Sequence, residues 1–144
     1  MPLADWIAWL RSHWLSHYRL PLGRRSENLA AEHLARQGMK IVERSYRCSL
    51  GEIDLVAVDK QTLVFVEVRS RVGSAKGEPW ETIRSTKRRK LSSLALLYLK
   101  SHRDRASMPA RFDVVSVVWN DPDQNDFQIE HFPNAFPLEG PWLA

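Results

Sequence analysis

Two acidic residues, Asp54 and Glu67, stand inside neighbouring β-like segments that are otherwise rich in valine and leucine. If Lys60 and Gln61 form a two-residue turn between these segments, Asp54 directly faces Glu67 across the resulting hairpin. Directly facing residues have Cβ atoms about 4.5–5.5 Å apart, so the two carboxylates repel each other. They therefore require either a cation between them or a raised pKa on one of them.

The alternation of side chains separates the two faces of this hairpin. One face is wholly apolar and is expected in the core: Ile53, Leu55, Ala57, Val64, Val66 and Val68. The other face is apolar near the turn and charged at the far end, where it carries Glu52, Asp54, Glu67 and Arg69. A face that is covered at one end and charged at the other is typical of a cleft floor.

These acids suit one kind of chemistry and leave a second interpretation open. A few carboxylates, with water and substrate phosphate completing the shell, are what Mg²⁺ prefers, and Glu27 on a preceding helix can supply a third. Such a metal neutralises the charge of a phosphodiester and can activate a water as the nucleophile. In the second interpretation Arg69 is the counter-ion, paired with Glu52 and Glu67 in an ion network without catalysis.

The helix that carries Glu27 is predicted over residues 26–38, with Ser26 as its N-cap and Gly38 at its end. At about 100° per residue, Glu27 lies close to the line of the apolar face, whereas Glu32 projects the opposite way. Of the two acids on this helix, only Glu27 can face what the helix covers.

Apolar and β-branched runs predict five strands, and a second helix is predicted over residues 83–102. The strands are expected at 39–47, 52–58, 63–69, 110–119 and 127–132. The order of one helix, three strands, one helix and a further strand predicts an α/β domain. Its sheet combines an antiparallel meander with one parallel strand that follows a helical crossover.

The second helix carries a basic run, Lys87, Arg88, Arg89 and Lys90, which can contact nucleic-acid phosphates and is also typical of a solvated helix face. Lys87 alone of the four shares the apolar stripe with residues such as Leu91, so its ammonium group is expected at the edge of the cleft.

On the fourth strand, Arg111 and Asp113 are two residues apart and are predicted to form a structural ion pair rather than a catalytic one.

Composition narrows the class of protein. The single cysteine, Cys48, excludes an internal disulfide framework and CxxC-type zinc sites, which is compatible with a reducing cytoplasm. The formal charge of +4 mildly favours an anionic partner. No apolar run is long enough for a membrane span, and Asp5 and Arg11 interrupt the run a signal peptide would need. We therefore expect a cytoplasmic protein.

Three segments are predicted along the chain. Residues 1–22 form a tryptophan-rich amphipathic helical extension, packed either on its own domain or a dimer mate, or bound to a membrane surface or partner. Residues 23–132 form the α/β domain, and residues 133–144 form a Pro-rich irregular tail.

The segments “GRRSENLAAEHLARQG”, “GEIDLVAVD”, “LVFVEVRSR” and “RFDVVSV” follow one another between residues 23 and 118. In this combination the chain resembles the YraN-like family of bacterial proteins, which is similar to the PD-(D/E)XK nuclease superfamily. The resemblance implies the restriction-endonuclease-like fold of Holliday-junction resolvases, with an α-β-β-β-α-β core and helices flanking a mixed central sheet. It also implies Mg²⁺- or Mn²⁺-dependent cleavage of DNA, and a homodimer, as in many nucleases of this fold.

In that superfamily a helix Glu, a strand Asp and the Glu of an E-x-K motif bind the metal, and the Lys assists the attacking water. The resemblance implies Glu27, Asp54 and Glu67 as metal ligands, with the Val68 carbonyl as a further donor. It makes Asp54, Glu67 and Arg69 the catalytic positions, and Arg69 departs from the pattern. Arginine stays protonated, so it can hold a phosphate but cannot act as a general base.

Two functions follow from that departure. Either the protein is an endonuclease in which Arg69 acts electrostatically, or it is a catalytically silent nucleic-acid-binding module or interaction protein in which Arg69 replaces the metal.

Overall fold

The computed structural model describes residues 2–7, 20–73 and 83–137. Two helices and five strands make the domain, with a short 3-10 helix, η2 (Pro122–Gln124), before the last strand. They are α2 (Leu22–Arg36), β1 (Lys40–Cys48), β2 (Gly51–Asp59), β3 (Thr62–Val72), α3 (Ser85–Ser101), β4 (Ala110–Asp121) and β5 (Asp126–Phe136). The predicted order of elements is confirmed.

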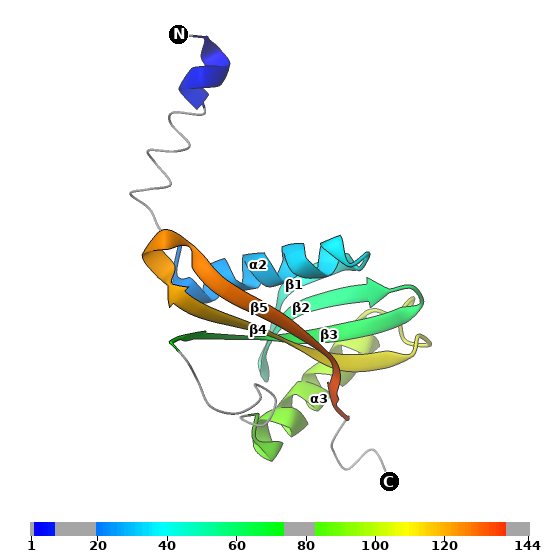
Figure 1. The fold of residues 1–144 in the computed structure, drawn as a ribbon. Coiled ribbons are helices and arrows are strands. Elements are labelled where there is room, and N and C mark those ends of the chain that lie inside the picture. The colour runs from blue at the N-terminus through cyan, green and yellow to red at the C-terminus, as the bar shows by residue number, and fades with distance from the viewer. Residues whose placement is uncertain (1, 8–19, 74–82, 138–144) are drawn as a thin grey trace.

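The five strands form one mixed sheet in chain order, β1-β2-β3-β4-β5. The pairs β1–β2, β2–β3 and β4–β5 are antiparallel, and β3 and β4 are parallel because α3 carries the chain back between them. The two helices cover opposite faces of the sheet (Figure 1). The fold is therefore the α/β arrangement with a restriction-endonuclease-like core that the sequence predicted.

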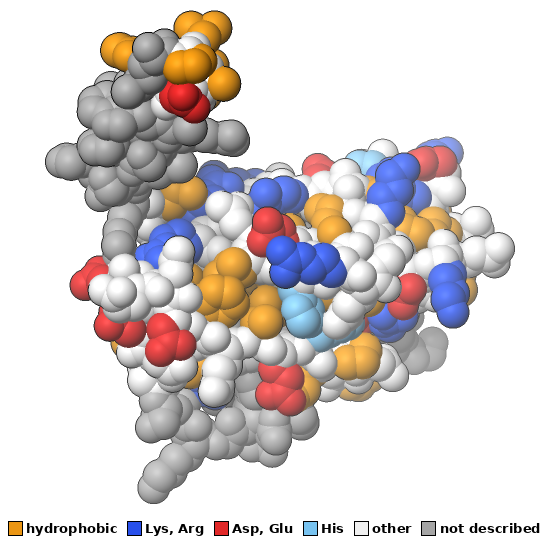
Figure 2. Space-filling view, turned by 45° about the horizontal axis from the view of Figure 1, so that its top comes forward, with side chains coloured by type: hydrophobic (Ala, Val, Ile, Leu, Met, Phe, Trp, Pro, Cys, Tyr) orange, Lys and Arg blue, Asp and Glu red, His pale blue; other side chains and the backbone are white. Residues whose placement is uncertain are grey.

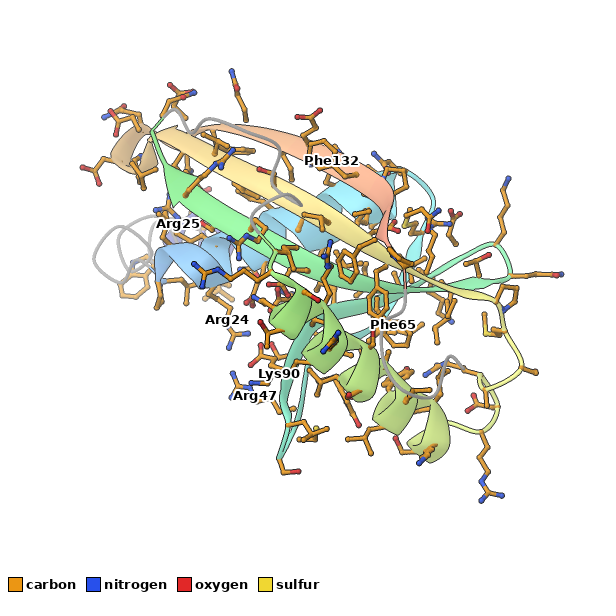
Figure 3. All side chains as sticks on the ribbon, turned by 90° about the horizontal axis from the view of Figure 1, so that it is seen from below. Arg24, Arg25, Arg47, Phe65, Lys90 and Phe132 are labelled. Carbon is orange, nitrogen blue, oxygen red and sulfur yellow. The ribbon has the colours of Figure 1, made fainter. Side chains whose placement is uncertain are left out.

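Each face of the sheet has its own apolar cluster. The cluster under α3 is rich in aromatic rings, and Phe65 points from the sheet toward that helix (Figure 3). The cluster under α2 is aliphatic and includes Leu55, Ala57, Val64 and Val66. Burial of both faces explains why the central strands read as nearly continuous apolar runs.

One residue of the predicted apolar face is on the other side. Ile53 packs in the cluster under α3 together with Val56, whereas Leu55 packs under α2. The prediction that Ile53 and Leu55 share a face is therefore wrong. In the neighbouring strand β1, Ser45 has a left-handed φ of 52°, and the register with β2 shifts between Ile41 and Glu43.

Ser26 is not the helix cap that the sequence predicted. Helix α2 begins at Leu22, after Pro21, and Ser26 is fully buried in its second turn. The Ser26 hydroxyl is 2.6 Å from the hydroxyl of Ser70 and accepts the indole N–H of Trp119 at 2.9 Å. These tertiary bonds, which sequence reasoning could not see, fix the helix against β3 and β4 and so fix the position of Glu27.

The predicted end of α2 is confirmed, since the helix stops at Arg36 and Gly38 follows with a φ of 93°, which glycine adopts without strain. The second helix begins at Ser85, slightly later than predicted, and Ile83 is buried just ahead of it.

The last strand continues beyond its predicted end. Strand β5 runs through Pro133 to Phe136, whose ring stacks on Phe112 with 4.8 Å between centroids. Residues 133–136 are therefore strand rather than irregular tail, and proline is tolerated because β5 is at the edge of the sheet. Residues 138–144 lie outside the described part of the chain.

The predicted ion pair on β4 is confirmed. Arg111 Nε is 2.9 Å from Asp113 Oδ1, and His131 Nε2 is 2.7 Å from Asp113 Oδ2. Burial raises the pKa of Asp113, but hydrogen bonds from His131, Arg111 and the Asn134 backbone N–H outweigh it and hold that pKa below its ordinary value. A second carboxylate, Asp59, accepts from Arg111 at 3.0 Å, which makes this a structural network at the turn end of the sheet.

Of the predicted N-terminal helix, residues 3–7 are helical, and most of the remainder lies outside the described residues. Among the helices that the structure describes, none has the length and apolar character needed to cross a membrane.

Replacement of Ser26 by alanine is expected to lower the free energy of unfolding by about 1–3 kcal/mol, because the buried Trp119 N–H loses its acceptor. Chemical denaturation followed by fluorescence measures this. The control is Ser93→Ala on α3. The Ser93 hydroxyl donates to the carbonyl of Arg89 within the same helix, and its loss should cost less than about 0.5 kcal/mol. Equal effects of the two variants would contradict the role given to Ser26.

Candidate metal centre

The hairpin of β2 and β3 has the two-residue turn and the register that the sequence predicted. Its paired residues run from Asp59 with Thr62, beside the turn, to Leu55 with Val66. The prediction is confirmed over this length.

The sheet forks one residue beyond the last of these pairs, at Asp54 and Glu67. From here β2 stays paired with β1, and β3 stays paired with β4 as far as Val72. The Asp54 carboxylate accepts the backbone N–H of Val68, with 2.8 Å between Oδ2 and N. Asp54 and Glu67 are therefore not a directly facing pair as predicted. Strands β2 and β3 separate here, and the Asp54 side chain replaces a backbone carbonyl as the acceptor of the Val68 N–H.

Three carboxylates converge at this fork. Glu27 from α2 and Glu52 and Asp54 from β2 each offer an oxygen, and these oxygens lie within 4.8 Å of one another. All three residues are partly buried. Glu27 and Asp54 were predicted as ligands, whereas Glu52 was given only an ion-pair role. Its signal was present, because Glu52 and Asp54 are two residues apart on one strand.

The crowding of acids perturbs Asp54 strongly. Burial, and next the charge of Glu67, raise the pKa of Asp54 to about 8, with smaller contributions from Glu27 and Glu52. The hydrogen bond from the Val68 N–H acts in the opposite direction and is outweighed. A cation at the fork would relieve this repulsion.

Glu67 is almost fully buried, with 7% of its surface exposed, and it forms an ion pair with the Lys87 ammonium group through Oε1. Lys87 comes from α3, and its side chain remains 45% exposed. The Lys87 ammonium group, which was expected at the edge of the cleft, thus lies beside Glu67. The sequence analysis had considered Arg69 as the counter-ion of Glu67. In the structure Lys87 of α3 is a counter-ion of this carboxylate.

Glu52 has a counter-ion from β1, because Arg47 Nε lies 2.7 Å from its Oε2. These two residues face each other in the β1–β2 ladder. The sequence had proposed Arg69, which lies on β3 opposite Ser116 and is half-buried. The roles predicted for Arg69 and for the Val68 carbonyl remain predictions.

The donor set fits a hard divalent cation. Every side-chain donor at the fork is a carboxylate oxygen, which is the ligand type that Mg²⁺ and Mn²⁺ favour. Burial, and next the charge of Glu67, raise the pKa of Asp54, so a cation beside this carboxylate would stabilise its ionised form. The oxygens of Glu27, Glu52 and Asp54 lie close enough together to hold one ion.

Basic side chains from three elements lie on the side of the fork where Arg47 pairs with Glu52. Arg24 on α2, Arg47 on β1 and Lys90 on α3 lie around the same end of the molecule (Figure 3). Lys90 crosses Gly51, where an added Cβ would be 3.0 Å from Lys90 Cε. Sequence reasoning missed Arg24 and Arg47, because only the folded chain brings them beside the fork.

The rest of the predicted basic run lies on the same helix, with Arg89 exposed and Arg88 partly buried. On the face that Figure 2 shows, by contrast, basic and acidic side chains are interspersed.

A family model described as “Uncharacterised protein family UPF0102” matches residues 26–117. The chain belongs to this family. The expected resemblance to the YraN-like family is thereby confirmed, and the matched segment contains Glu27, Asp54, Glu67 and Lys87.

Relatives match over most of their length. A UPF0102 protein of Syntrophotalea carbinolica is 41% identical over 126 residues, which are 88% of this chain and 99% of the relative. One of Geobacter metallireducens is 43% identical over 124 residues, 86% of this chain and 98% of the relative. One of Clavibacter michiganensis is 47% identical over 98 residues, 68% of this chain and 82% of the relative.

The raised pKa of Asp54 predicts a stability that depends on pH. Its folded-state pKa of about 8 lies above its ordinary value near 3.9, so its contribution to stability is lost as pH rises through this interval. In metal-free buffer at pH 8, the free energy of unfolding of Asp54→Asn should therefore exceed that of wild type by about 1–3 kcal/mol. Chemical denaturation measures this difference. The difference should shrink as pH is lowered toward 5.

The matched control is Glu32→Gln, on the exposed side of α2 with Arg36 at 4.0 Å, which should change stability by less than about 0.5 kcal/mol at either pH. An Asp54→Asn protein no more stable than wild type at pH 8 would show that the acids do not repel as described.

Proposed function

We propose that this protein is a Mg²⁺- or Mn²⁺-dependent endonuclease that hydrolyses phosphodiester bonds in DNA, with its site at the fork of the sheet. The observation that carries the proposal is the convergence of three carboxylates from α2 and β2 at the fork, with Glu67 of β3 near Asp54 and basic side chains close by. Acids at the centre suit a metal, and cations at the rim suit the phosphates of a polyanion.

Each residue has a part in this proposal. Glu27, Asp54 and Glu67 hold the ion, with Glu52 beside them and the Val68 carbonyl as a further donor. When bound, the ion supplies charge neutralisation for the scissile phosphate and a more acidic water. Glu67 exchanges its ion pair with Lys87 for this role, which frees the ammonium group for a phosphate oxygen.

Arg69 is the residue that sets the rate in this proposal. Its planar guanidinium group can hold the phosphate by two hydrogen bonds. It cannot accept the proton of the attacking water, so hydrolysis is expected to be slow. The cytoplasm, where bacterial DNA lies, is the proposed compartment.

One contact favours a second function, a nucleic-acid-binding module without catalysis. Lys87 already neutralises Glu67, so the Glu67 carboxylate is occupied by a side-chain cation instead of being available to a metal. In that case the basic residues bind DNA or RNA, and affinity falls steeply with salt.

Incubation of the protein with plasmid, single-stranded and branched DNA in Mg²⁺ or Mn²⁺ should give cleavage that chelation abolishes. Asp54→Asn and Glu67→Gln should each lower the cleavage rate by about 100-fold or more. Loss of a side chain that binds the metal directly matters at least as much as loss of one that only hydrogen-bonds to such a ligand. Glu32→Gln should cut like wild type.

Cleavage that survives Asp54→Asn would refute the assigned site. Salt-sensitive binding without cleavage in either metal would refute the nuclease and leave the binding module.

A further inference from the structure

A small cavity opens directly beside the acids. Its volume is about 210 Å³, and it lies between the start of β2 and helix α3, lined by Gly51, Glu52, Lys87, Lys90, Leu91 and Leu94. Two of the residues that line it also belong to the candidate metal centre. Glu52 contributes to the carboxylate cluster, and Lys87 pairs with Glu67. A group in this cavity would therefore lie next to any phosphate held at the fork.

The lining of the cavity combines apolar side chains with cationic ones and one carboxylate, that of Glu52. Leu91 and Leu94 are the apolar side chains, and both are almost fully buried in the cluster under α3. Lys87 and Lys90 provide two ammonium groups, of which that of Lys87 is paired with Glu67, and both residues are exposed. Gly51, with a φ of +140°, leaves its wall without a side chain and gives Lys90 room to lie across it.

These walls select a chemical class of ligand. A bare phosphate or metal ion would leave the leucine side chains without a partner, and a purely apolar group would make no use of the lysines. A flat ring with limited polarity that carries a phosphate satisfies both kinds of side chain. A cavity of about 210 Å³ has room for a single base, whereas a base pair is larger.

We infer that this cavity binds the base of an unpaired nucleotide beside the scissile phosphate, so that DNA with single-stranded segments is the substrate class. The inference rests on the proposed nuclease function. A base within a duplex must leave its stack and its partner before it can enter such a cavity, and an unpaired base avoids most of that cost. The leucine side chains provide no hydrogen-bond readout of the base.

Fluorescence anisotropy with a labelled oligothymidine strand and a blunt hairpin duplex of equal length tests this in metal-free buffer, where no cleavage occurs. Wild type should bind the single strand at least about 10-fold more tightly than the duplex. Lys90→Trp fills the cavity and also removes one positive charge. It should weaken single-strand binding about 10-fold, and duplex binding only by the small factor that the loss of one charge produces.

Two further variants separate volume from charge. Lys90→Gln removes only the ammonium group and should weaken single-strand binding less than Lys90→Trp does. Arg89→Gln, at the neighbouring exposed position outside the cavity, removes the same charge and should weaken both probes by the same small factor. Lys90 is also exposed, so thermal melting should show both of its variants folded.

Equal loss of both probes in Lys90→Trp would overturn the inference, because Lys90 would then be a general phosphate contact. If the single strand is bound as described but never cut, the cavity inference stands and the nuclease proposal fails. If wild type and Lys90→Trp cut duplex and single strand equally well, the nuclease proposal stands and the inference fails.

Discussion

The hydrogen bond from the Val68 backbone N–H to the Asp54 carboxylate is the contact on which the candidate site depends. A backbone donor in the interior of a sheet must have an acceptor, and here a side chain takes the place of a backbone carbonyl. Strands β2 and β3 can therefore separate without leaving this N–H unsatisfied. In the opening between them Asp54 comes within reach of Glu52 and of Glu27 on the helix above.

Carboxylates placed this close together lower the stability of the metal-free protein, and other interactions in the molecule offset that loss. Both faces of the sheet bury apolar clusters, and each separated strand keeps an outer neighbour. Lys87 and Arg47 neutralise two of the acids. Asp54 is left with the strongly raised pKa, which makes it the member of the cluster with most to gain from a cation. Strain concentrated at one point of a well-packed domain is typical of functional sites.

Local patterns in the sequence were sufficient for the sheet and for the principal acids. The turn and the alternation of side chains predicted the hairpin register, and the same reasoning placed Asp54 and Glu67 at one end of it. The fork was not predictable, because alternation assumes a regular ladder and the Val68 bond breaks it. Ser26 was misread for a related reason, since a hydroxyl beside a helix start suits a cap as well as a buried tertiary bond.

The most direct test of the account is a crystal structure of the protein grown with Mn²⁺, with anomalous scattering used to locate the ion. The account predicts one strong peak at the fork, about 2.1 Å from oxygens of Asp54 and Glu67, with the Lys87 ammonium group moved away from Glu67. An unchanged ion pair between Lys87 and Glu67 at millimolar Mn²⁺, with no peak among the carboxylates, would contradict it. The fork would then be a closed ion network rather than a metal centre.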